Sequence, residues 1–372
     1  MIDPMEPVYL DYNASAPLRP DILALMTDIW HRPGNASSVH GFGRTARKYV
    51  EEARSRVAEL VGVKPAQVIF NSGATEGNNT VLHAYQGQRV LVSAIEHPSV
   101  LYVLPQAETI PVTQDGVIDL DALRQLIEQG EPPALISVMT VNSETGVIQP
   151  IQDIAKLAKA CGAHLHTDSV QAAGRIALDM TDMGVDYLTL SAHKMGGPQG
   201  VGALIVRRGL DIPRYILGGS QESLKRAGTH NTAGIAGMGL AAEMARQGLQ
   251  DYDRIRNLRD AMEDALLGIA PEARIFGTQA PRVGNTTDIA LPGVDAQIQM
   301  MALDLDGVAV SSGSACSSGT FKPSHVLKAM GAEENICRSA LRISLGYGTT
   351  ASDIDRFISA WKKMYMTTRV GS

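Results

Sequence analysis

The most constraining feature of this sequence is a repeated alternation between short apolar runs and longer amphipathic stretches. Residues 43–61 place apolar side chains three or four positions apart, which predicts a helix with one buried face. A similar helix is predicted at 150–160. Short runs rich in large apolar or β-branched residues predict buried strands at 68–70, 90–92, 135–139, 164–167, 187–190 and 201–206. Strands that alternate with helices favour a mostly parallel sheet that is covered on both faces.

The last third of the chain has a different pattern, in which strands and helices no longer alternate regularly. Helical stretches are predicted at 251–267, 296–306 and 353–364, and strand-like runs are predicted at 273–276 and 287–291. The 372 residues are long enough for two domains. We therefore expect a large α/β domain at 15–257 and a smaller α+β domain formed by 1–14 and 258–372.

The composition excludes several classes of protein. No apolar run approaches the roughly 18–20 residues of a membrane span, and a net charge of −6 lacks the basic surface of a nucleic-acid binder. Three cysteines cannot make a disulfide framework, and no signal-peptide pattern is present, so we expect a cytoplasmic protein. Cys161 and Cys337 lie in apolar helical stretches and should pack there, and no His/Cys spacing predicts a metal site.

Two polar motifs follow predicted strands, which is where ligands bind in open α/β sheets. Residues 71–79 contain Gly73 and Thr75 ahead of a helical stretch. This pattern suits an anion at a helix N-terminus, but it also suits a plain turn with a capping residue. Asp168 follows another predicted strand, and its carboxylate either binds a ligand or caps the next helix.

A lysine and a cysteine stand in turns of small residues. Lys194 lies beside His193 in a Gly- and Pro-rich turn, where the glycines indicate close approach of the backbone to another group. A desolvated lysine can form a Schiff base, whereas an exposed lysine is the alternative. Cys316 has only small neighbours in 311–319, which favours an accessible thiol over a buried one.

Arg342 and His97 are ambiguous by themselves. Arg342 interrupts a strand-like apolar run at 341–346, so it needs an anionic partner there. That partner is either a substrate carboxylate or a structural salt bridge. His97 also follows a predicted strand, and a core or capping histidine is the alternative to a catalytic one.

Taken in this order and spacing, the motifs resemble those of the pyridoxal-phosphate-dependent cysteine desulfurases of the nitrogen-fixation and iron-sulfur-cluster type. These enzymes belong to the class V aminotransferase family. The resemblance runs from Tyr9 to about Trp361. The segments that carry it are Ser191-Ala192-His193-Lys194, Ser312-Gly313-Ser314-Ala315-Cys316, Gly73-Ala74-Thr75-Glu76, Glu96-His97 and Arg226-Ala227-Gly228-Thr229.

The resemblance implies a fold and an activity. The fold is the type I fold of pyridoxal-phosphate-dependent transferases, an α/β architecture with a mostly parallel seven-stranded sheet in the large domain. The smaller α+β domain would carry the Cys316 loop. The implied activity converts L-cysteine to L-alanine and transfers the sulfur to Cys316 as a persulfide. An unidentified acceptor protein would then receive this sulfur for iron-sulfur clusters or thio-cofactors.

The resemblance also implies roles for individual residues. Lys194 would hold the cofactor covalently, Cys316 would be the nucleophile, and His97 would stack on the ring and handle protons. Asp168 would pair with the pyridinium nitrogen, and Thr229 would reach the phosphate of the neighbouring subunit in a homodimer. The implied cofactor-binding residues are Ala74, Thr75, His97, Asp168, Gln171, Ser191, His193, Lys194 and Thr229. The implied substrate-binding residues are Arg342, Asn13 and Ser143.

Two features depart from the family's pattern. The family's Asn-Asn-Glu-x-Gly motif reads Asn142-Ser143-Glu144-Thr145-Gly146 here, so a shorter side chain stands at position 143. The chain also stops soon after 361–364, whereas housekeeping relatives carry a longer tail that docks the cluster scaffold. The alternatives are a selenocysteine lyase, another class V enzyme, or a non-catalytic sulfur-transfer platform.

Overall fold

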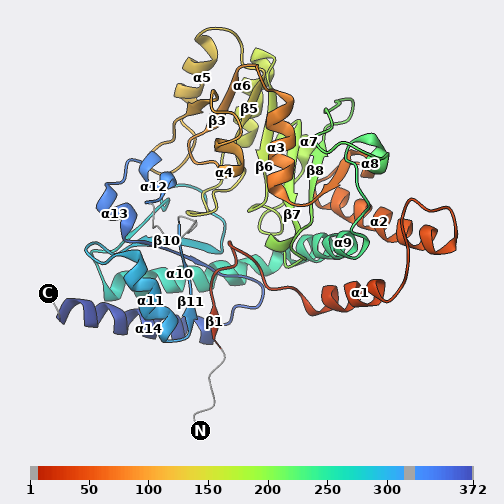
Figure 1. Ribbon diagram of the computed structural model, residues 1–372. Helices are drawn as coiled ribbons and strands as arrows, with labels where there is room; N and C mark the ends of the chain where they lie inside the picture. Colours follow the sequence, from red (N-terminus) through yellow and green to blue (C-terminus); the bar gives the residue numbers. More distant parts are fainter. Residues whose placement is uncertain (1–6, 314–322, 371–372) are drawn as a thin grey trace.

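A seven-stranded sheet forms the centre of the larger part of the molecule (Figure 1). The structure is a computed structural model that describes residues 7–313 and 323–370. The strand order is β2-β8-β7-β6-β5-β3-β4. The strands are β2 (Val68–Asn71), β3 (Val90–Ser93), β4 (Glu108–Ile110), β5 (Leu135–Ser137), β6 (His164–Asp168), β7 (Tyr187–Ser191) and β8 (Gly202–Val206).

The sheet is mostly parallel, as the sequence predicted. Parallel pairing joins the five consecutive strands β4, β3, β5, β6 and β7 to one another. β8 is antiparallel to both β7 and β2. Because β6 and β7 run in the same direction, their carboxyl ends, at Asp168 and Ser191, lie at the same edge of the sheet.

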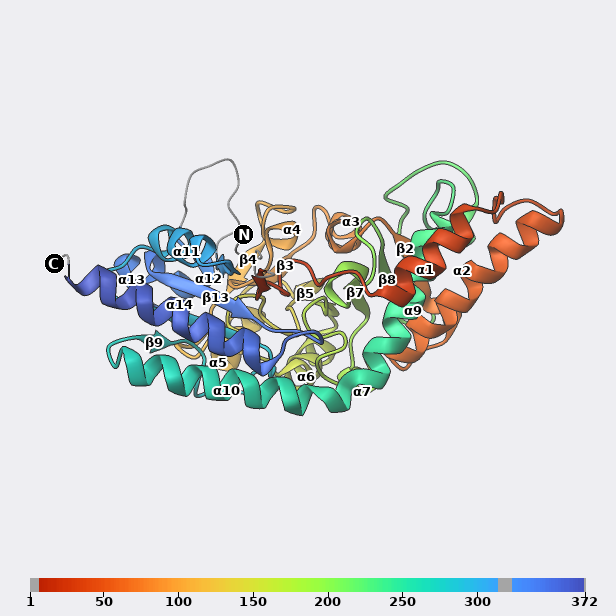
Figure 2. The ribbon, with the colours of Figure 1, turned by 90° about the horizontal axis from the view of Figure 1, so that it is seen from below.

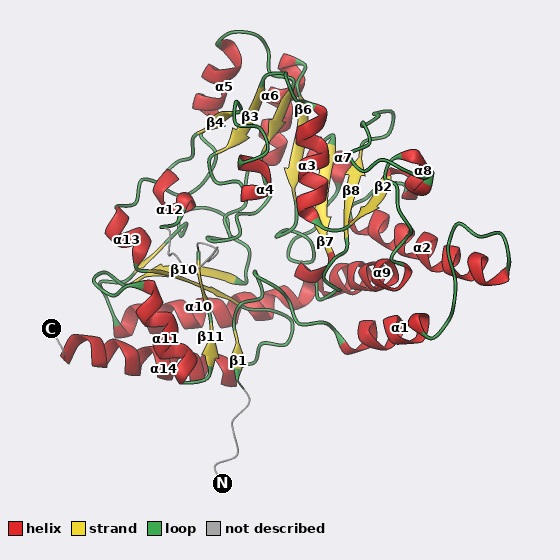
Figure 3. Cartoon of the chain, in the orientation of Figure 1, coloured by secondary structure: helices red, strands yellow, loops and turns green. Residues whose placement is uncertain are grey.

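Helices cover both faces of this sheet (Figure 3). One face packs against apolar residues of α2, α5, α6 and α9, and the other face packs against α3 and α4. The helices of this part are α1 (Pro20–Trp30), α2 (Gly41–Leu60), α3 (Ala74–Ala84), α4 (Pro98–Leu101), α5 (Leu120–Glu128), α6 (Ile151–Cys161), α7 (Met180–Met183), α8 (Gln221–Leu224) and α9 (Thr232–Gln247). Short 3-10 turns occur at η1 (Pro65–Gln67), η2 (Ala192–Lys194) and η3 (Gly248–Asp251).

The C-terminal part is built on a four-stranded antiparallel sheet of order β12-β13-β10-β9. Figure 2 shows α10 and α14 running alongside each other beneath it. A separate pair joins β1 to β11 in parallel. The elements are β1 (Val8–Tyr9), α10 (Tyr252–Ile269), β9 (Arg274–Ile275), β10 (Thr286–Ala290), α11 (Ala296–Leu305), β11 (Val308–Ala309), β12 (Ser311–Ser312), α12 (His325–Ala329), α13 (Glu334–Arg338), β13 (Ala340–Ser344) and α14 (Ala351–Val370).

The core of the C-terminal part includes residues from the N-terminus. Val8 and Leu10 pack in one apolar cluster with residues of α10, α11 and α14. We propose that the chain divides as the sequence predicted, with 1–14 belonging to the smaller domain. The boundary expected after residue 257 falls inside α10, and Ile255, near the start of this helix, already packs in the C-terminal cluster.

Two further properties of the described residues bear on function. None of the helices in 7–313 and 323–370 has the length and apolar character needed to cross a bilayer. Cys337 is buried and Cys161 is half-buried, and both pack against apolar clusters as the sequence predicted.

Candidate functional site

Asp168 lies at the centre of the candidate site, as the last residue of β6. Its side chain is buried, and it accepts hydrogen bonds from Asn78 Nδ2 at 2.8 Å and from the backbone N–H of Val170 at 3.0 Å. The bond from Val170 closes a local turn, as expected of a capping residue, but it involves only one of the two carboxylate oxygens. The other oxygen is held by α3, which fixes the carboxylate at the edge of the sheet.

Lys194 follows β7 directly, in the turn η2. Its Nζ donates to the carbonyl oxygens of Asn13 at 2.5 Å and Ala14 at 2.8 Å. Burial, together with the positive charges of Arg342 and Arg175, lowers the pKa of Lys194 to about 8. This amine therefore loses its proton far more readily than a lysine in water.

His97 joins this group from the start of α4. Its Nδ1 accepts a hydrogen bond from the backbone N–H of Ser99 at 3.1 Å, so the histidine caps the helix, as one of the two readings of the sequence allowed. Burial lowers the pKa of His97, Lys194 lowers it further, and Asp168 opposes both. The three side chains are thus close enough to influence one another's charge.

The N-terminus of α3 offers a place for an anion beside this group. Ala74 is the first helical residue, Thr75 is exposed, and Gly73 before them has a φ of 153°, a conformation that favours glycine. Unpaired N–H groups and the helix dipole make such an end attractive to phosphate.

Ser191 and His193 flank the start of the lysine turn. Ser191 is buried at the end of β7, and His193 Nδ1 lies 3.3 Å from Ser15 Oγ. Burial and the charge of Lys194 lower the pKa of His193 to about 4, so its ring is neutral at pH 7. A neutral imidazole can donate one hydrogen bond to a bound anion.

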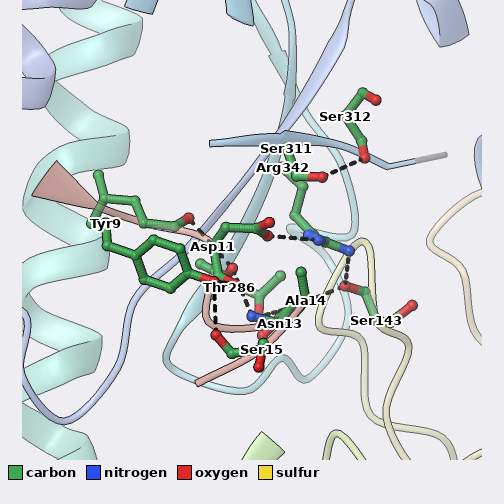
Figure 4. A network of polar contacts seen from close by, with 12 residues as sticks. Tyr9, Asp11, Asn13, Ala14, Ser15, Ser143, Thr286, Ser311, Ser312 and Arg342 are labelled. Atoms are coloured by element: carbon green, nitrogen blue, oxygen red, sulfur yellow. Dashed lines mark hydrogen bonds and ion pairs between the residues drawn. The ribbon is translucent and has the colours of Figure 1, made fainter. Parts of the chain in front are cut away.

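Arg342 reaches the site from β13 of the smaller sheet (Figure 4). Its Nη2 forms an ion pair with Asp11 Oδ1 at 2.8 Å, and its Nη1 lies 3.4 Å from the carbonyl oxygen of Ser143. Its Nε is buried with no acceptor among the described residues. The salt bridge foreseen as one alternative therefore exists, and it leaves part of the guanidinium unused.

Asn13 and Ser143 lie beside Arg342. Asn13 Nδ2 donates to the carbonyl oxygen of Ser143 and to Thr286 Oγ1, each at 3.0 Å. The contacts that Ser143 makes with Asn13 and Arg342 therefore come from its main chain, which any residue at this position would supply. These bonds bring the three expected substrate-binding residues together.

Gln171 is bonded to other residues of the chain. Its Nε2 donates to the carbonyl oxygen of Asn13 at 3.0 Å, the oxygen that also receives Lys194 Nζ, and its Oε1 accepts from Arg175. Arg175 is buried and contributes to the low pKa of Lys194. Arg175 was not predicted from the sequence; it follows Gln171 by four residues in the turns after β6.

Several other residues near the site were also missed. Asn78 lies within the glycine-rich motif at 71–79, and Asp11 lies in the N-terminal segment that carries the resemblance. Glu144 is buried and accepts a hydrogen bond from Ser324 Oγ at 2.5 Å. Burial raises the pKa of Glu144 and also that of Asp288. The backbone of Asp288 lies opposite that of Arg342 in the β10–β13 ladder.

Two expected site residues are not placed with this group. Thr229 is exposed, in a segment that the ion pair between Arg226 Nε and Glu76 Oε1, 2.9 Å long, ties to the start of α3. Cys316 lies outside the described residues. Within 7–313 and 323–370, no three His, Cys, Asp or Glu side chains are grouped as a metal site.

Comparisons with known proteins show the family of the chain. The model of the "Aminotransferase class-V" family matches residues 8–357. The cysteine desulfurase IscS of Dictyoglomus turgidum is 39% identical over 363 residues, covering 94% of this chain and 92% of the relative. The cysteine desulfurase of Sinorhizobium fredii is 40% identical over 373 residues, covering 95% of each protein.

A solved structure gives the same result in three dimensions. The X-ray structure of a NifS-like protein from Rickettsia africae superposes with a TM-score of 0.91 at 34% identity, covering 97% of this chain and 100% of that one. The type I fold expected from the sequence is therefore present. The chain belongs to the pyridoxal-phosphate-dependent class V aminotransferase family and, within it, to the cysteine desulfurases.

Proposed function

We propose that this cysteine desulfurase holds pyridoxal phosphate through Lys194 and passes the sulfur of L-cysteine to Cys316. The observation that carries the proposal is the meeting of three groups at one edge of the sheet. Lys194 and Arg342 are both bonded to the segment 11–14, and Asp168 lies close enough to Lys194 to affect its charge. An amine, a carboxylate and a guanidinium are the groups that a cofactor of this class and an amino-acid substrate require.

The residues present fit the cofactor. A side chain at Gly73 would meet no described atom within 4 Å, so the start of α3 opens onto free space. The buried carboxylate of Asp168 would hold the ring nitrogen, and the N-terminus of α3 with Thr75, Ser191 and His193 would hold the phosphate. When bound, pyridoxal phosphate supplies a sink for the electron pair released at the substrate Cα.

Side chains of the protein itself would then move the protons. Lys194, with a pKa of about 8, can exist as a free amine near neutral pH and is placed to take and return the Cα proton. His97 is uncharged at pH 7, because burial lowers its pKa, and it can relay a proton within the site. Gln171, whose amide oxygen is bound by Arg175, would use its remaining N–H toward the cofactor's hydroxyl.

Arg342 and Asn13 would hold the carboxylate of L-cysteine. Arg342 Nη1 and Asn13 Nδ2 both contact the carbonyl oxygen of Ser143, and Arg342 Nε has no described acceptor (Figure 4). An arginine binds a carboxylate through paired N–H groups, which fixes both position and orientation.

The proposed sulfur transfer balances in atoms and electrons. The thiolate of Cys316 attacks the substrate sulfur, an S–S bond forms, and the C–S bond breaks. The electron pair of the C–S bond stays with carbon, which takes up a proton and becomes the methyl group of L-alanine. Both sulfurs are oxidised to the persulfide level while the carbon is reduced, so no outside oxidant is needed, and only the thiolate reacts.

The working unit is proposed to be a homodimer in which Thr229 serves the neighbouring site. Trp30 and Phe42 are 64% and 62% exposed, and with His230, Asn231 and Thr232 they line one surface hollow next to Thr229. Exposed apolar side chains of this size mark an interaction surface. A cytoplasmic location is proposed from the sparse cysteines, and an acceptor protein would take the persulfide for iron-sulfur clusters or thio-cofactors.

The test uses purified protein with L-cysteine and a thiol reductant, and it measures sulfide and alanine together. The wild type should release both in equal amounts, Lys194→Ala should release neither, and Cys316→Ala should fall to the background rate. If Cys316→Ala forms sulfide as fast as the wild type, the proposal is wrong. The comparisons do not favour the selenocysteine lyase and platform alternatives.

A further inference from the structure

An ion pair that the sequence analysis did not foresee lies at the edge of the candidate site (Figure 4). Asp11 Oδ1 and Arg342 Nη2 are 2.8 Å apart, and their side chains are only 18% and 9% exposed. Charges this sheltered are poorly screened by solvent, so the pair holds the guanidinium more firmly than a surface pair would. The two residues are 331 positions apart, so the contact belongs to the tertiary fold.

Asp11 supplies the negative charge that faces Arg342 in the described part of the chain. Asp288 lies opposite Arg342 in the β10–β13 ladder, but its carboxyl oxygens have no hydrogen-bond partner among the described residues. Burial raises the pKa of Asp288 and of Glu144, which disfavours the charged form of both. Among the described residues, the ion pair of Arg342 is with Asp11 and not with either of these carboxyl groups.

Asp11 accepts a hydrogen bond from only one of the three nitrogen atoms of the Arg342 guanidinium. It accepts from Nη2, the carbonyl oxygen of Ser143 lies 3.4 Å from Nη1, and the buried Nε has no described acceptor. An unpaired buried donor is costly, and a second carboxylate is the acceptor that suits it. One donor of the guanidinium is therefore without a described acceptor while Asp11 stays in place.

The segment that carries Asp11 also holds Lys194. Two and three residues after Asp11, the carbonyl oxygens of Asn13 and Ala14 accept from Lys194 Nζ at 2.5 and 2.8 Å. The segment is itself anchored to Ser344, because Tyr12 N donates to its carbonyl oxygen at 3.2 Å and Asn13 N donates to its Oγ at 3.0 Å. Ser344 lies on β13, two residues beyond Arg342.

We propose that Asp11 is a positioning residue that orients Arg342, and that the segment 11–14 sets the spacing between Arg342 and Lys194 for an α-amino acid. In such a substrate the carboxylate is attached to the carbon that loses the proton. Arg342 must therefore bind the carboxylate at a fixed distance from Lys194, which takes the proton. This inference rests on the proposed function, because it assumes that Arg342 receives the carboxylate of L-cysteine.

The test is the effect of Asp11→Asn on the KM and kcat of the holoenzyme with L-cysteine. Asparagine keeps the size and one acceptor oxygen but removes the charge. We expect KM to rise about tenfold, the loss typical of one charge-assisted hydrogen bond, while kcat changes by less than about threefold. In an Arg342→Ala background, Asp11→Asn should leave KM unchanged, because its effect passes through Arg342.

A matched variant separates this role from general stability. Asp186 is 13% exposed, pairs with Arg207 at 2.5 Å, and directly precedes β7, away from the carboxyl edge. Asp186→Asn should lower the thermal unfolding midpoint without changing KM. Thermal unfolding of the Asp11 and Arg342 single and double variants should show coupling between the two residues, a readout independent of turnover.

Each result decides the matter. An unchanged or lower KM in Asp11→Asn, or a fall in kcat alone, would overturn the positioning role, and so would an additive effect in the Arg342→Ala background. A wild-type protein that forms no alanine would instead reject the proposed function, so the two failures are distinguishable.

Discussion

Glu222 shows how one residue can fix a strained segment, here the one between β8 and α9. Its buried carboxylate accepts from Arg54 Nη1 and Nη2 at 2.7 and 2.8 Å, from Phe70 N at 2.9 Å and from His230 Nε2 at 2.8 Å. Glu222, Ser223 and Leu224 have φ values of 48°, 53° and 69°, which are costly for residues with side chains. The bonds offset this strain just before the segment that carries Thr229.

These bonds predict how stability depends on pH. The hydrogen bonds from Arg54 and His230 lower the pKa of Glu222 to about 2, against an ordinary value of 4.5, although burial alone would raise it. The carboxylate thus stabilises the fold above pH 4.5, and this contribution is lost as pH falls toward 2. Glu222→Gln should cost about 3 kcal/mol of unfolding free energy at pH 7, and the difference should shrink below about pH 4.

Urea unfolding at neutral and acidic pH measures this difference. Glu243→Gln is the control, because Glu243 pairs with Arg56 at 3.0 Å but is 34% exposed, and its loss should cost under about 1 kcal/mol. An equal cost for Glu222→Gln at pH 7 and in acid would show that the charge of Glu222 is not what stabilises the fold.

At the scale of elements, the turn at 142–146 packs tightly against the end of β12. A Cβ at Gly313 would lie 2.3 Å from Glu144 Oε2, and Glu144 also binds Ser324, the cap of α12. Gly313→Ala should therefore displace the buried carboxyl and cost about 1–3 kcal/mol of unfolding free energy.

A helical glycine provides the control for this variant. Gly268 lies in α10, and no described atom stands within 4 Å of its added Cβ, so Gly268→Ala should stabilise the protein by about 0.5–1 kcal/mol. Urea unfolding compares the two variants with the wild type. If Gly313→Ala is as stable as the wild type, the contact with Glu144 is looser than the structure indicates.

The sequence predicted six of the seven strands of the central sheet, because each of these is a short apolar run with a polar end. It missed β4, whose sequence Glu108-Thr109-Ile110 is not an apolar run, and it missed α9, whose glycines lower helix propensity. The structure explains those glycines: a Cβ at Gly239 would lie 2.5 Å from Ala53 Cα, so α9 packs directly on α2. Strands of two residues, such as β1 and β12, are too short to show any period.

The candidate site was predicted to the extent that its residues lie in local motifs. Asp168, Lys194 and His97 each follow a strand, and that context is visible in the sequence. Asp11 was missed because its role depends on Arg342, which only the tertiary fold brings near. The same reason applies to Glu144 and Ser324, which are 180 positions apart.

At the scale of the whole molecule, the exposed apolar surface at α1 and α2 predicts the oligomeric state. Phe42→Glu places a charge beside Trp30 and the residues next to Thr229, so it should convert a dimer to a monomer and weaken cofactor retention. Light scattering after size exclusion measures the mass. Leu305→Glu, on α11 and 85% exposed, should leave the mass unchanged, and a dimeric Phe42→Glu would place the interface elsewhere.

Sulfur that leaves L-cysteine through Cys316 should be trapped on this residue in a single-turnover labelling experiment. The holoenzyme is mixed with L-cysteine carrying a heavy sulfur isotope, without reductant, and is analysed by mass spectrometry. The proposed transfer predicts one labelled sulfur on the peptide that contains Cys316, with one alanine formed per label. Alanine formation with no label on Cys316, or with the label on Cys161 or Cys337 instead, would contradict it.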